Sequence, residues 1–285
     1  MRSKPECDQC FLRQAIHAAK LSNLDTGSTK RLISAVKDEL AHTAVDVTPP
    51  VRASRVHAVV RSISGNPDPY RQAKQQATSH ALELYPQLKQ LLEQSDDPLD
   101  TAVRLAIAGN IIDLGVASHY DLEGSIRRVL QEPLAIDHLD ALREALDRVD
   151  SVLYLADNAG ETVMDRLLIE TIGKPVTYVV KGGPAVNDAT VEDAKAAGLD
   201  QVCNITDNGA AILGTLLEQV SPRFRERFDT AELIIAKGMA NYESLSGSDR
   251  PIFFLLQAKC PVISEHLGVA EKSIVVLKQQ FNQTG

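Results

Sequence analysis

An Asp-Asn pair, Asp157 and Asn158, directly follows the apolar run SVLYLA and comes just before Gly160. Carboxylate and carboxamide oxygens are hard ligands that suit Mg²⁺, Mn²⁺ or a similar divalent cation. Neighbouring side chains can turn toward one ion only if the backbone leaves its extended geometry, which Gly160 permits. The alternative is an Asx turn that caps a helix without binding anything. Glu161 would then supply a first-turn charge favoured by the helix dipole.

A second pair, Asn187 and Asp188, follows the apolar run PVTYVV after a short glycine-containing loop. Helix capping is a weaker explanation here, because Thr190 and Asp193 already have the spacing of a capping box for the next helix. The second pair can therefore supply the remaining protein oxygens for a single metal ion. Two such pairs at the same edge of a sheet favour a cation site over two independent caps.

Other polar residues follow the remaining apolar runs. Lys181 and Lys237 each stand at the end of such a run, and Asn241 lies within one turn of Lys237. A lone lysine there is usually solvated, but opposite a cation it becomes a candidate phosphate ligand. Asp207 is interpreted either as the cap of a long helix beginning near Gly209 or as part of a substrate-facing loop. In that loop, small residues would let an anion approach the helix amides.

Other common site motifs are missing from the sequence. It has no G-x-G-x-x-G, no G-x-x-x-x-G-K-[ST] and no G-x-S-x-G, so dinucleotide, Walker-type and serine-hydrolase sites are unsupported. Cys7 and Cys10 form a C-x-x-C without a second pair or histidines at ligand spacing. A metal or redox role and simple local packing both remain open for this pair, and the role of Cys260 is also open. Cys203 lies within an apolar run and is expected to be buried.

The elements that must position these residues change character at mid-chain. After about residue 148, short Val- and Ile-rich runs alternate with helical segments, which predicts a mainly parallel sheet covered on both faces. The expected strands are SVLYLAD, PVTYVVKGG, QVCNI, AELIIAKG, PIFFLLQ and SIVVLKQ. Ligands of such sheets bind beyond the carboxyl ends of the strands, near a switch in strand order. The candidate residues described above fall at these ends.

The first half has apolar residues at three- and four-residue spacing and no convincing strand, which predicts helices. We therefore expect an α/β protein with a helical N-terminal region, residues 1–148. Residues 149–285 would form a Rossmann-like, mainly parallel, three-layer α/β/α domain that carries the metal and phosphate site.

The length, net charge and cysteine content of the chain limit its possible functions and its cellular compartment. The 285-residue chain has a formal net charge of −8, which argues against a broad nucleic-acid interface. No run approaches the ~18 apolar residues of a membrane span. The first residues, MRSKPECDQC, contain no apolar segment of a secretory signal. With four cysteines in a chain of this length, we expect the reducing cytoplasm.

The motifs together resemble the damage-control phosphatases, metal-dependent enzymes first catalogued as domain of unknown function 89. The resemblance covers nearly the whole chain and includes the C-x-x-C typical of the prokaryotic branch. It is carried by AGNIIDLG (108–115), DNAGE (157–161), VVKGGPAVNDAT (179–190), AKGMANYESL (236–245) and KCPVIS (259–264).

This resemblance implies a cation at the sheet edge and hydrolysis of small phosphate monoesters such as sugar phosphates or damaged phosphometabolites. The implied metal ligands are Asp157, Asn158 and Asp188, and Lys237 matches the lysine of a family element. Asn110 and Asp113 match family positions on the helical half. The cation would be Mn, Ni, Co or Mg, and the partner a small phosphorylated metabolite.

Two attacks are open: Asp157 could be the nucleophile, or the metal could activate a water. Asp113 or Glu161 could act as general acid or base, and the remaining polar residues, Lys181, Asn110, Asn187, Asn241 and Asp207, could bind substrate. A non-catalytic phosphometabolite-binding protein is the main alternative, and a carboxyl methyltransferase is a weaker one. The natural substrate and the oligomeric state stay open.

Overall fold

The computed structural model describes residues 1–109 and 122–279. Asn110 and Asp113, both predicted site residues, lie outside these ranges. The helices are α1 (Glu6–Leu21), α2 (Thr26–His42), α3 (Pro49–Ser64), α4 (Arg71–Glu93), α5 (Pro98–Gly109), α6 (Leu122–Gln131), α7 (Leu139–Arg148), α8 (Thr162–Ile172), α9 (Val191–Ala196), α10 (Pro222–Thr230), α11 (Gly238–Leu245) and α12 (Pro261–Leu267). The strands are β1 (Ile136–Asp137), β2 (Val152–Leu155), β3 (Val176–Val180), β4 (Asn204–Asp207), β5 (Ile234–Lys237), β6 (Ile252–Gln257) and β7 (Ile274–Lys278).

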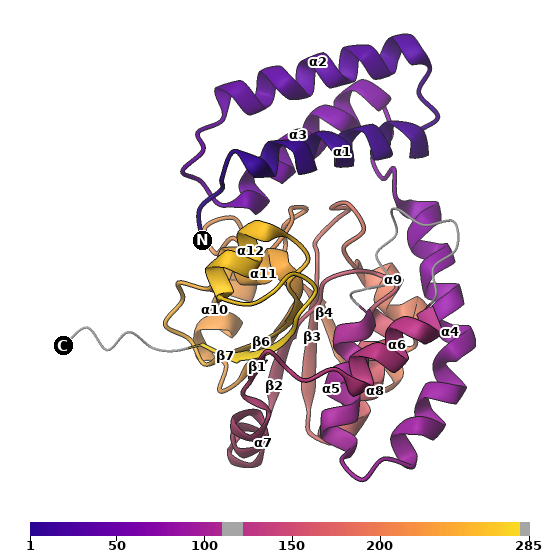
Figure 1. The fold of residues 1–285 in the computed structure, drawn as a ribbon, viewed down its shortest axis with the longest axis vertical. Coiled ribbons are helices and arrows are strands. Elements are labelled where there is room, and N and C mark those ends of the chain that lie inside the picture. Colours follow the sequence, from indigo (N-terminus) through magenta and orange to yellow (C-terminus); the bar gives the residue numbers. More distant parts are fainter. Residues whose placement is uncertain (110–121, 280–285) are drawn as a thin grey trace, which may run out of the picture.

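The strands form one sheet in the order β1-β7-β6-β5-β2-β3-β4 (Figure 1). Strands β2 to β6 are parallel, β7 runs antiparallel to β6, and β1 is parallel to β7. The chain builds outward from β2 through β3 and β4, then crosses back to place β5 on the other side of β2. The strand order therefore switches between β2 and β5, where sheets of this kind bind their ligands.

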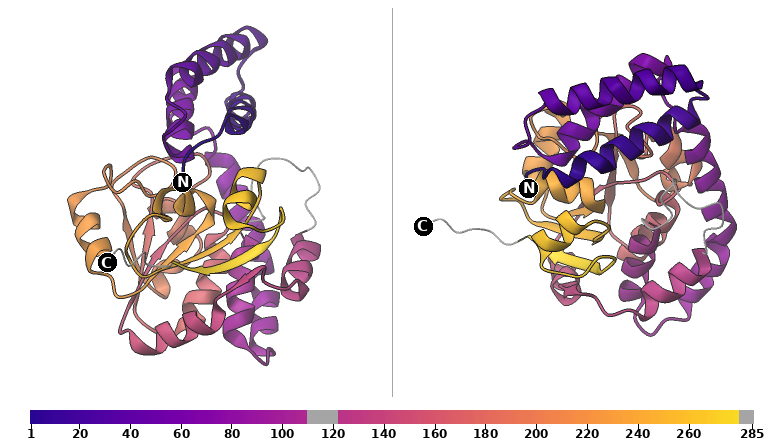
Figure 2. Two further views of the ribbon diagram at one scale, coloured as in Figure 1. Left: turned by 60° about the vertical axis from the view of Figure 1, so that its left-hand side comes forward. Right: turned by 45° about the horizontal axis from the view of Figure 1, so that its top comes forward.

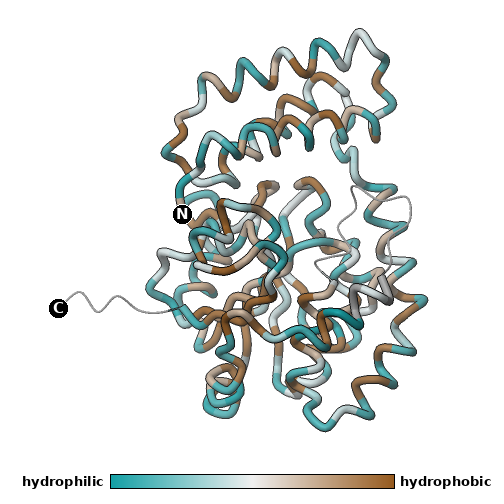
Figure 3. The backbone as a smooth tube through the Cα atoms, viewed as in Figure 1, coloured by the Kyte–Doolittle hydropathy of each residue, from teal (hydrophilic) through white to brown (hydrophobic). Residues whose placement is uncertain are grey.

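Helices cover both faces of the sheet, as the near-continuous apolar strands predict. One face, with Tyr154 and Tyr178, packs against α4 to α8, and the other, with Leu155 and Phe254, packs against α10 to α12. Figure 3 shows the hydrophobic tracts gathered in the strands, whereas hydrophilic and hydrophobic residues alternate along the outer helix α2. The predicted three-layer α/β/α class is confirmed.

Helices α1 to α3 form a separate unit with its own apolar cluster. Figures 1 and 2 show this unit as a layer across the end of the sheet, above the loops that follow β3 and β4. Val186 and Leu213, from those two loops, pack against the cluster. The N-terminal helices thus lie over the carboxyl end of the sheet, where the candidate site was predicted.

Two sequence-based expectations are wrong. The first half does contain a strand, because the two residues of β1 pair with β7; so short a segment has no detectable period. The long helix expected after Asp207 is absent from this described stretch, and residues 208–221 form an irregular loop that precedes α10. Gly209 and Gly214 adopt positive φ there (+78° and +67°), which interrupts a helix. The capping side chain is Ser221, which accepts from the Phe224 amide.

Helices α1 to α7 all lie within residues 1–148, the part of the chain for which helices are predicted. The predicted boundary at residue 148 stays a prediction. Among the described residues, no helix combines the length and apolar character needed to cross a membrane.

Candidate functional site

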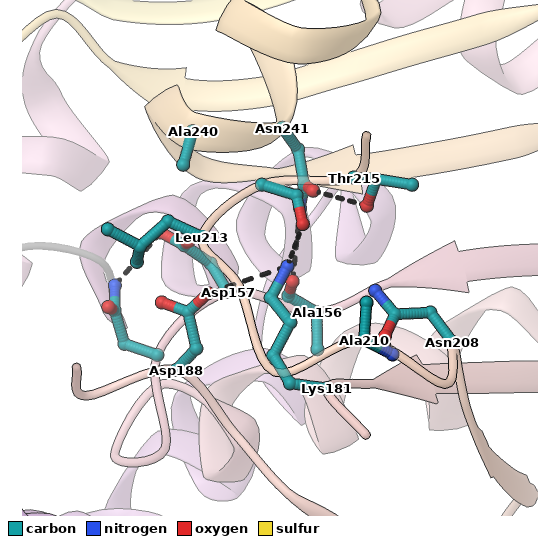
Figure 4. A network of polar contacts seen from close by, with 12 residues as sticks. Ala156, Asp157, Lys181, Asp188, Asn208, Ala210, Leu213, Thr215, Ala240 and Asn241 are labelled. Atoms are coloured by element: carbon teal, nitrogen blue, oxygen red, sulfur yellow. Dashed lines mark hydrogen bonds and ion pairs between the residues drawn. The ribbon is translucent and has the colours of Figure 1, made fainter. Parts of the chain in front are cut away.

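The two Asp-Asn pairs meet at the carboxyl ends of β2 and β3. Asn158 and Asp188 form an antiparallel β-bridge, and the Ala189 amide donates to the carbonyl of Asp157 (2.8 Å). The Asn187 side chain donates to Asn158 Oδ1 (2.8 Å), and Asn158 Nδ2 donates to Asp157 Oδ2 (2.9 Å). Figure 4 shows Asp157 and Asp188 near one another at this rim. The structure therefore brings together all three predicted metal ligands, together with Asn187.

A close backbone approach fixes the position of Asp157. Gly238, the first residue of α11, has φ of +76°, and a Cβ on it would overlap the Asp157 carboxyl group. Because β2 and β5 are neighbours in the sheet, this contact lies at the switch in strand order. A glycine is needed here because it adopts positive φ easily and because any side chain would overlap Asp157.

A buried network of charges lies beneath the rim. Lys237 Nζ donates to Glu161, to Asp165 Oδ1 (2.6 Å) and to the carbonyl of Ala106 (2.9 Å). Asp165 also accepts from the hydroxyls of Tyr154 and Tyr178, each at 2.7 Å. Glu161 in turn accepts from Asn158 Nδ2 (3.0 Å), so this hydrogen bond connects the buried network to a residue of the rim.

This geometry changes the interpretation of Lys237. Its three ammonium hydrogens have three protein acceptors, and the side chain is fully buried. Burial lowers the pKa of Lys237, but the charges of Asp165 and Glu161 outweigh that effect, and its pKa is raised overall. Lys237 thus anchors the buried carboxylates in this structure, and its predicted contact with phosphate remains a prediction.

Burial, followed by the closeness of several acidic groups, raises the pKa values of carboxyl groups at the rim. Burial raises the pKa of Asp157 well above its ordinary value, and the charges of Asp188 and Glu161 raise it further. The charges of Lys259 and Lys181 oppose this rise in the pKa of Asp157. Burial also raises the pKa of Glu161, against the opposing charge of Lys237. Additional positive charge at the rim would favour the ionised form of Asp157.

The other predicted binding residues lie in three different settings. Lys181 pairs with Asp188 (3.4 Å) and donates to the carbonyl of Gly214, so it faces the rim (Figure 4). Asn241 is buried: its amide donates to the carbonyls of Ala156 (3.0 Å) and Lys237 (2.8 Å), which ties β2 to β5. Its role in this structure is to hold the backbone.

Asp207 lies apart from the rim cluster. It is exposed, and its carboxylate accepts from the Gly209 amide (2.8 Å) in an Asx turn. The neighbouring Asn208 is buried, and its Oδ1 accepts from the amides of Ala210 (2.9 Å) and Gly182 (3.3 Å). Of these two residues it is therefore Asn208 that joins the loops after β3 and β4.

Asp165, Gly238 and Lys259 are functional candidates that the sequence analysis did not assign. Asp165 lies in the first turn of α8, four residues after Glu161, which immediately precedes the helix, and that spacing could have signalled it. Gly238 follows Lys237 directly, where a glycine marks a possible close approach. Lys259 belongs to the quoted KCPVIS motif, but its proximity to Asp157 and Glu161 arises from the tertiary fold.

A cavity of about 600 Å³ lies beside the rim, between α4 and the loop that follows β3. Its lining includes Lys181 and Asp207 but none of Asp157, Asn158 and Asp188. Side chains of α4, among them Gln75, Thr78 and Ser79, form the opposite wall. The cavity therefore adjoins the rim at Lys181 and gives room for a small organic group.

The donor chemistry at the rim fits a hard divalent cation. Two carboxylates and the Asn158 carbonyl oxygen, which keeps a second lone pair beyond its bond from Asn187, are oxygen ligands of the required kind. Within residues 1–109 and 122–279, no three His, Cys, Asp or Glu side chains form a metal-binding group on their own. The set described here is instead two aspartates and one asparagine.

A testable pH effect arises at Glu243 on α11, two residues after Asn241. Burial raises its pKa from 4.5 to about 8. A carboxyl with a raised pKa in the folded state lowers stability as the pH rises from about 4.5 to about 8. Glu243→Gln should flatten this part of the stability profile in urea unfolding at pH 5, 7 and 8.5. Exposed Glu271→Gln is the control, and profiles parallel to the wild type in both variants would refute the effect.

The sequence matches the damage-control phosphatase ARMT1-like domain over residues 3–275. The chain belongs to this family, which confirms the resemblance. It is similar to a damage-control phosphatase of Archaeoglobus fulgidus (38% identity, covering 94% of this chain and 96% of the relative). A damage-control phosphatase of Pyrococcus horikoshii is 35% identical over 99% of both chains.

A further relative and a solved structure also match nearly the whole chain. An uncharacterized protein of Methanocaldococcus jannaschii is 38% identical, covering 98% of this chain and 96% of the relative. The crystal structure of a DUF89 family protein from P. horikoshii superposes with a TM-score of 0.90 and 33% identity, covering 98% of this chain and 100% of the other. The family and the fold therefore extend over the whole sheet and the helical layer.

Proposed function

We propose that the protein is a divalent-metal-dependent phosphatase that hydrolyses small phosphate monoesters, such as sugar phosphates or damaged phosphometabolites. The proposal rests on one observation above all: Asp157, Asn158 and Asp188 meet at the carboxyl ends of β2 and β3, next to the switch in strand order between β2 and β5. Membership of the damage-control phosphatase family and the names of two relatives support the same activity.

Asp157, Asn158 and Asp188 would hold the cation, which is Mn, Ni, Co or Mg. When bound, the cation supplies positive charge that offsets the charge of the substrate phosphate and polarises its oxygens. Lys181 and Lys259 are the lysines best placed for the remaining phosphate oxygens, because the charges of both lower the pKa of Asp157. The cavity beside Lys181 would take the alcohol part of the ester.

The buried network has a positioning role in this proposal. Glu161 accepts from Lys237 and from the Asn158 side chain, so it orients a ligand. In the reaction, either the Asp157 carboxylate or a water molecule would attack the phosphorus, and the bond to the alcohol oxygen would break as that oxygen takes up a proton. If Asp157 attacks, a water molecule would then cleave the aspartyl-phosphate and release inorganic phosphate. An attack by Asp157 needs its ionised form, which burial disfavours and the nearby positive charges favour.

The test is a phosphate-release screen over a panel of sugar and cofactor phosphates. Each ester is assayed after removal of metals with EDTA and then with Mn²⁺, Ni²⁺, Co²⁺ or Mg²⁺ added singly. We expect release only with added metal, with the largest rates on a small subset of esters. Release that is unchanged by EDTA would contradict the metal site. Thermal stabilisation by an ester without release would support a non-catalytic binder instead.

A further inference from the structure

The turn before Asp188 contains an unusual backbone conformation. The Asp188 amide donates to the carbonyl of Ala185 (3.0 Å), which closes a four-residue turn with Val186 and Asn187 at its centre. Val186 has φ of +53°, while Asn187 is not among the residues with positive φ. Positive φ at only the first central position is the pattern of a type II′ turn, in which glycine usually occupies that position. A side chain branched at Cβ rarely adopts it.

The side chain of Val186 explains why valine can occupy this position. It packs against the apolar cluster of α1 to α3, the helical unit that lies above the loops after β3 and β4 (Figure 2). Leu213, from the next loop, packs on the same cluster, and its amide donates to Ser54 Oγ on α3 (3.2 Å). The helical unit therefore holds the turn from outside the α/β layers.

The same turn carries the second Asp-Asn pair to the first. Asn187 donates from its side chain to Asn158 Oδ1 (2.8 Å), and its carbonyl accepts from the Ala159 amide (2.9 Å). Asp188 follows and forms the bridge with Asn158. A change in the turn at residue 186 would therefore move a predicted ligand and the hydrogen-bond partner of another.

We propose that Val186 is a positioning residue for the cation site, and that α1 to α3 act through it to hold Asp188 in place. Without the contact to the helical cluster, a β-branched residue would leave the positive-φ region, and the turn would relax. The helical unit thus forms part of the metal site although it contributes none of the three proposed ligands. This inference rests on the proposed function, because it concerns the cation of that site.

The experiment measures Mn²⁺ binding to the full chain by calorimetry, independently of catalysis, for wild type and three variants. Val186→Ala removes the anchor and keeps a residue that disfavours positive φ, so its affinity should fall the most, by about 10-fold or more, as outer-shell changes typically do. Val186→Gly also removes the anchor but tolerates the conformation, so it should lose less. Val186→Ile keeps the anchor and should bind as the wild type does.

Two matched controls separate positioning from general stability. Val59→Ala truncates another half-buried valine on the same cluster, and Lys272→Gly relaxes another positive φ (+70°) away from the rim. Both should leave the Mn²⁺ affinity unchanged, whatever their effect on thermal unfolding. If the alanine variant unfolds, the glycine and isoleucine variants still decide the question.

Equal Mn²⁺ affinity in the wild type and Val186→Gly would overturn this inference while leaving the cation site intact. The inference would also be overturned if Val59→Ala lost as much Mn²⁺ affinity as Val186→Ala. General loosening of the apolar cluster would then be enough to explain the loss. A wild-type chain that binds no Mn²⁺ would instead refute the cation site of the proposed function.

Discussion

Asp157→Asn should reduce metal-dependent phosphate release by about 10²- to 10³-fold, the size of effect that follows loss of a key charge-stabilising group. The variant removes a ligand charge, and it also removes the nucleophile if Asp157 attacks phosphorus. Phosphate release with saturating Mn²⁺ and an ester identified by the screen measures the effect.

The same variant should remain folded. The raised pKa of Asp157 means that its ionised form opposes folding in the absence of metal. Asparagine resembles the protonated acid, so metal-free Asp157→Asn should be at least as stable as the wild type at pH 7. Asp150→Asn, at an exposed site before β2, is the matched control and should keep full activity. Undiminished metal-dependent activity in Asp157→Asn would remove Asp157 from the mechanism.

Lys237→Met should cost roughly 3–5 kcal/mol of unfolding free energy, the usual range when one partner of a buried ion pair is removed. Glu161 and Asp165 would keep their buried positions and lose their shared cation. Urea unfolding of the metal-free protein measures the change. The loss should be smaller at pH 5 than at pH 8, because carboxyl groups that take up a proton no longer need the ammonium.

Lys89→Met is the matched control, since it removes a lysine from a partly exposed pair with Glu170 (3.0 Å). Exposed ion pairs contribute at most ~1 kcal/mol, so this variant should stay close to the wild type. A Lys237→Met variant that keeps wild-type stability and loses only activity would contradict the anchoring role. That result would favour the phosphate contact implied by the family resemblance.

The sequence was sufficient to predict the fold class and the meeting of the two Asp-Asn pairs at one edge of the sheet. The change of hydrophobic period predicted the sheet, and the carboxyl ends of parallel strands necessarily share one edge. Asp157, Asn158 and Asp188 were therefore predicted as neighbours, and the structure places them together. The capping box of Thr190 and Asp193 is also present, which supports the argument that Asn187 and Asp188 were not needed as caps.

The directions of side chains could not be predicted in the same way. Lys237 ends an apolar strand, and only the tertiary fold shows that Asp165 and the carbonyl of Ala106 lie within reach of its ammonium. Local propensity also failed at residues 208–221, where the backbone follows the positive φ of Gly209 and Gly214 rather than a helical pattern. Both cases depend on contacts between segments far apart in the sequence.

Anomalous diffraction from crystals grown with Mn²⁺ tests the central claim most directly. The predicted result is one strong anomalous peak at the ends of β2 and β3, within ~2.6 Å of oxygen atoms from Asp157, Asn158 and Asp188, the reach of hard-cation ligands. A peak elsewhere, with these three side chains outside its coordination sphere, would contradict the account.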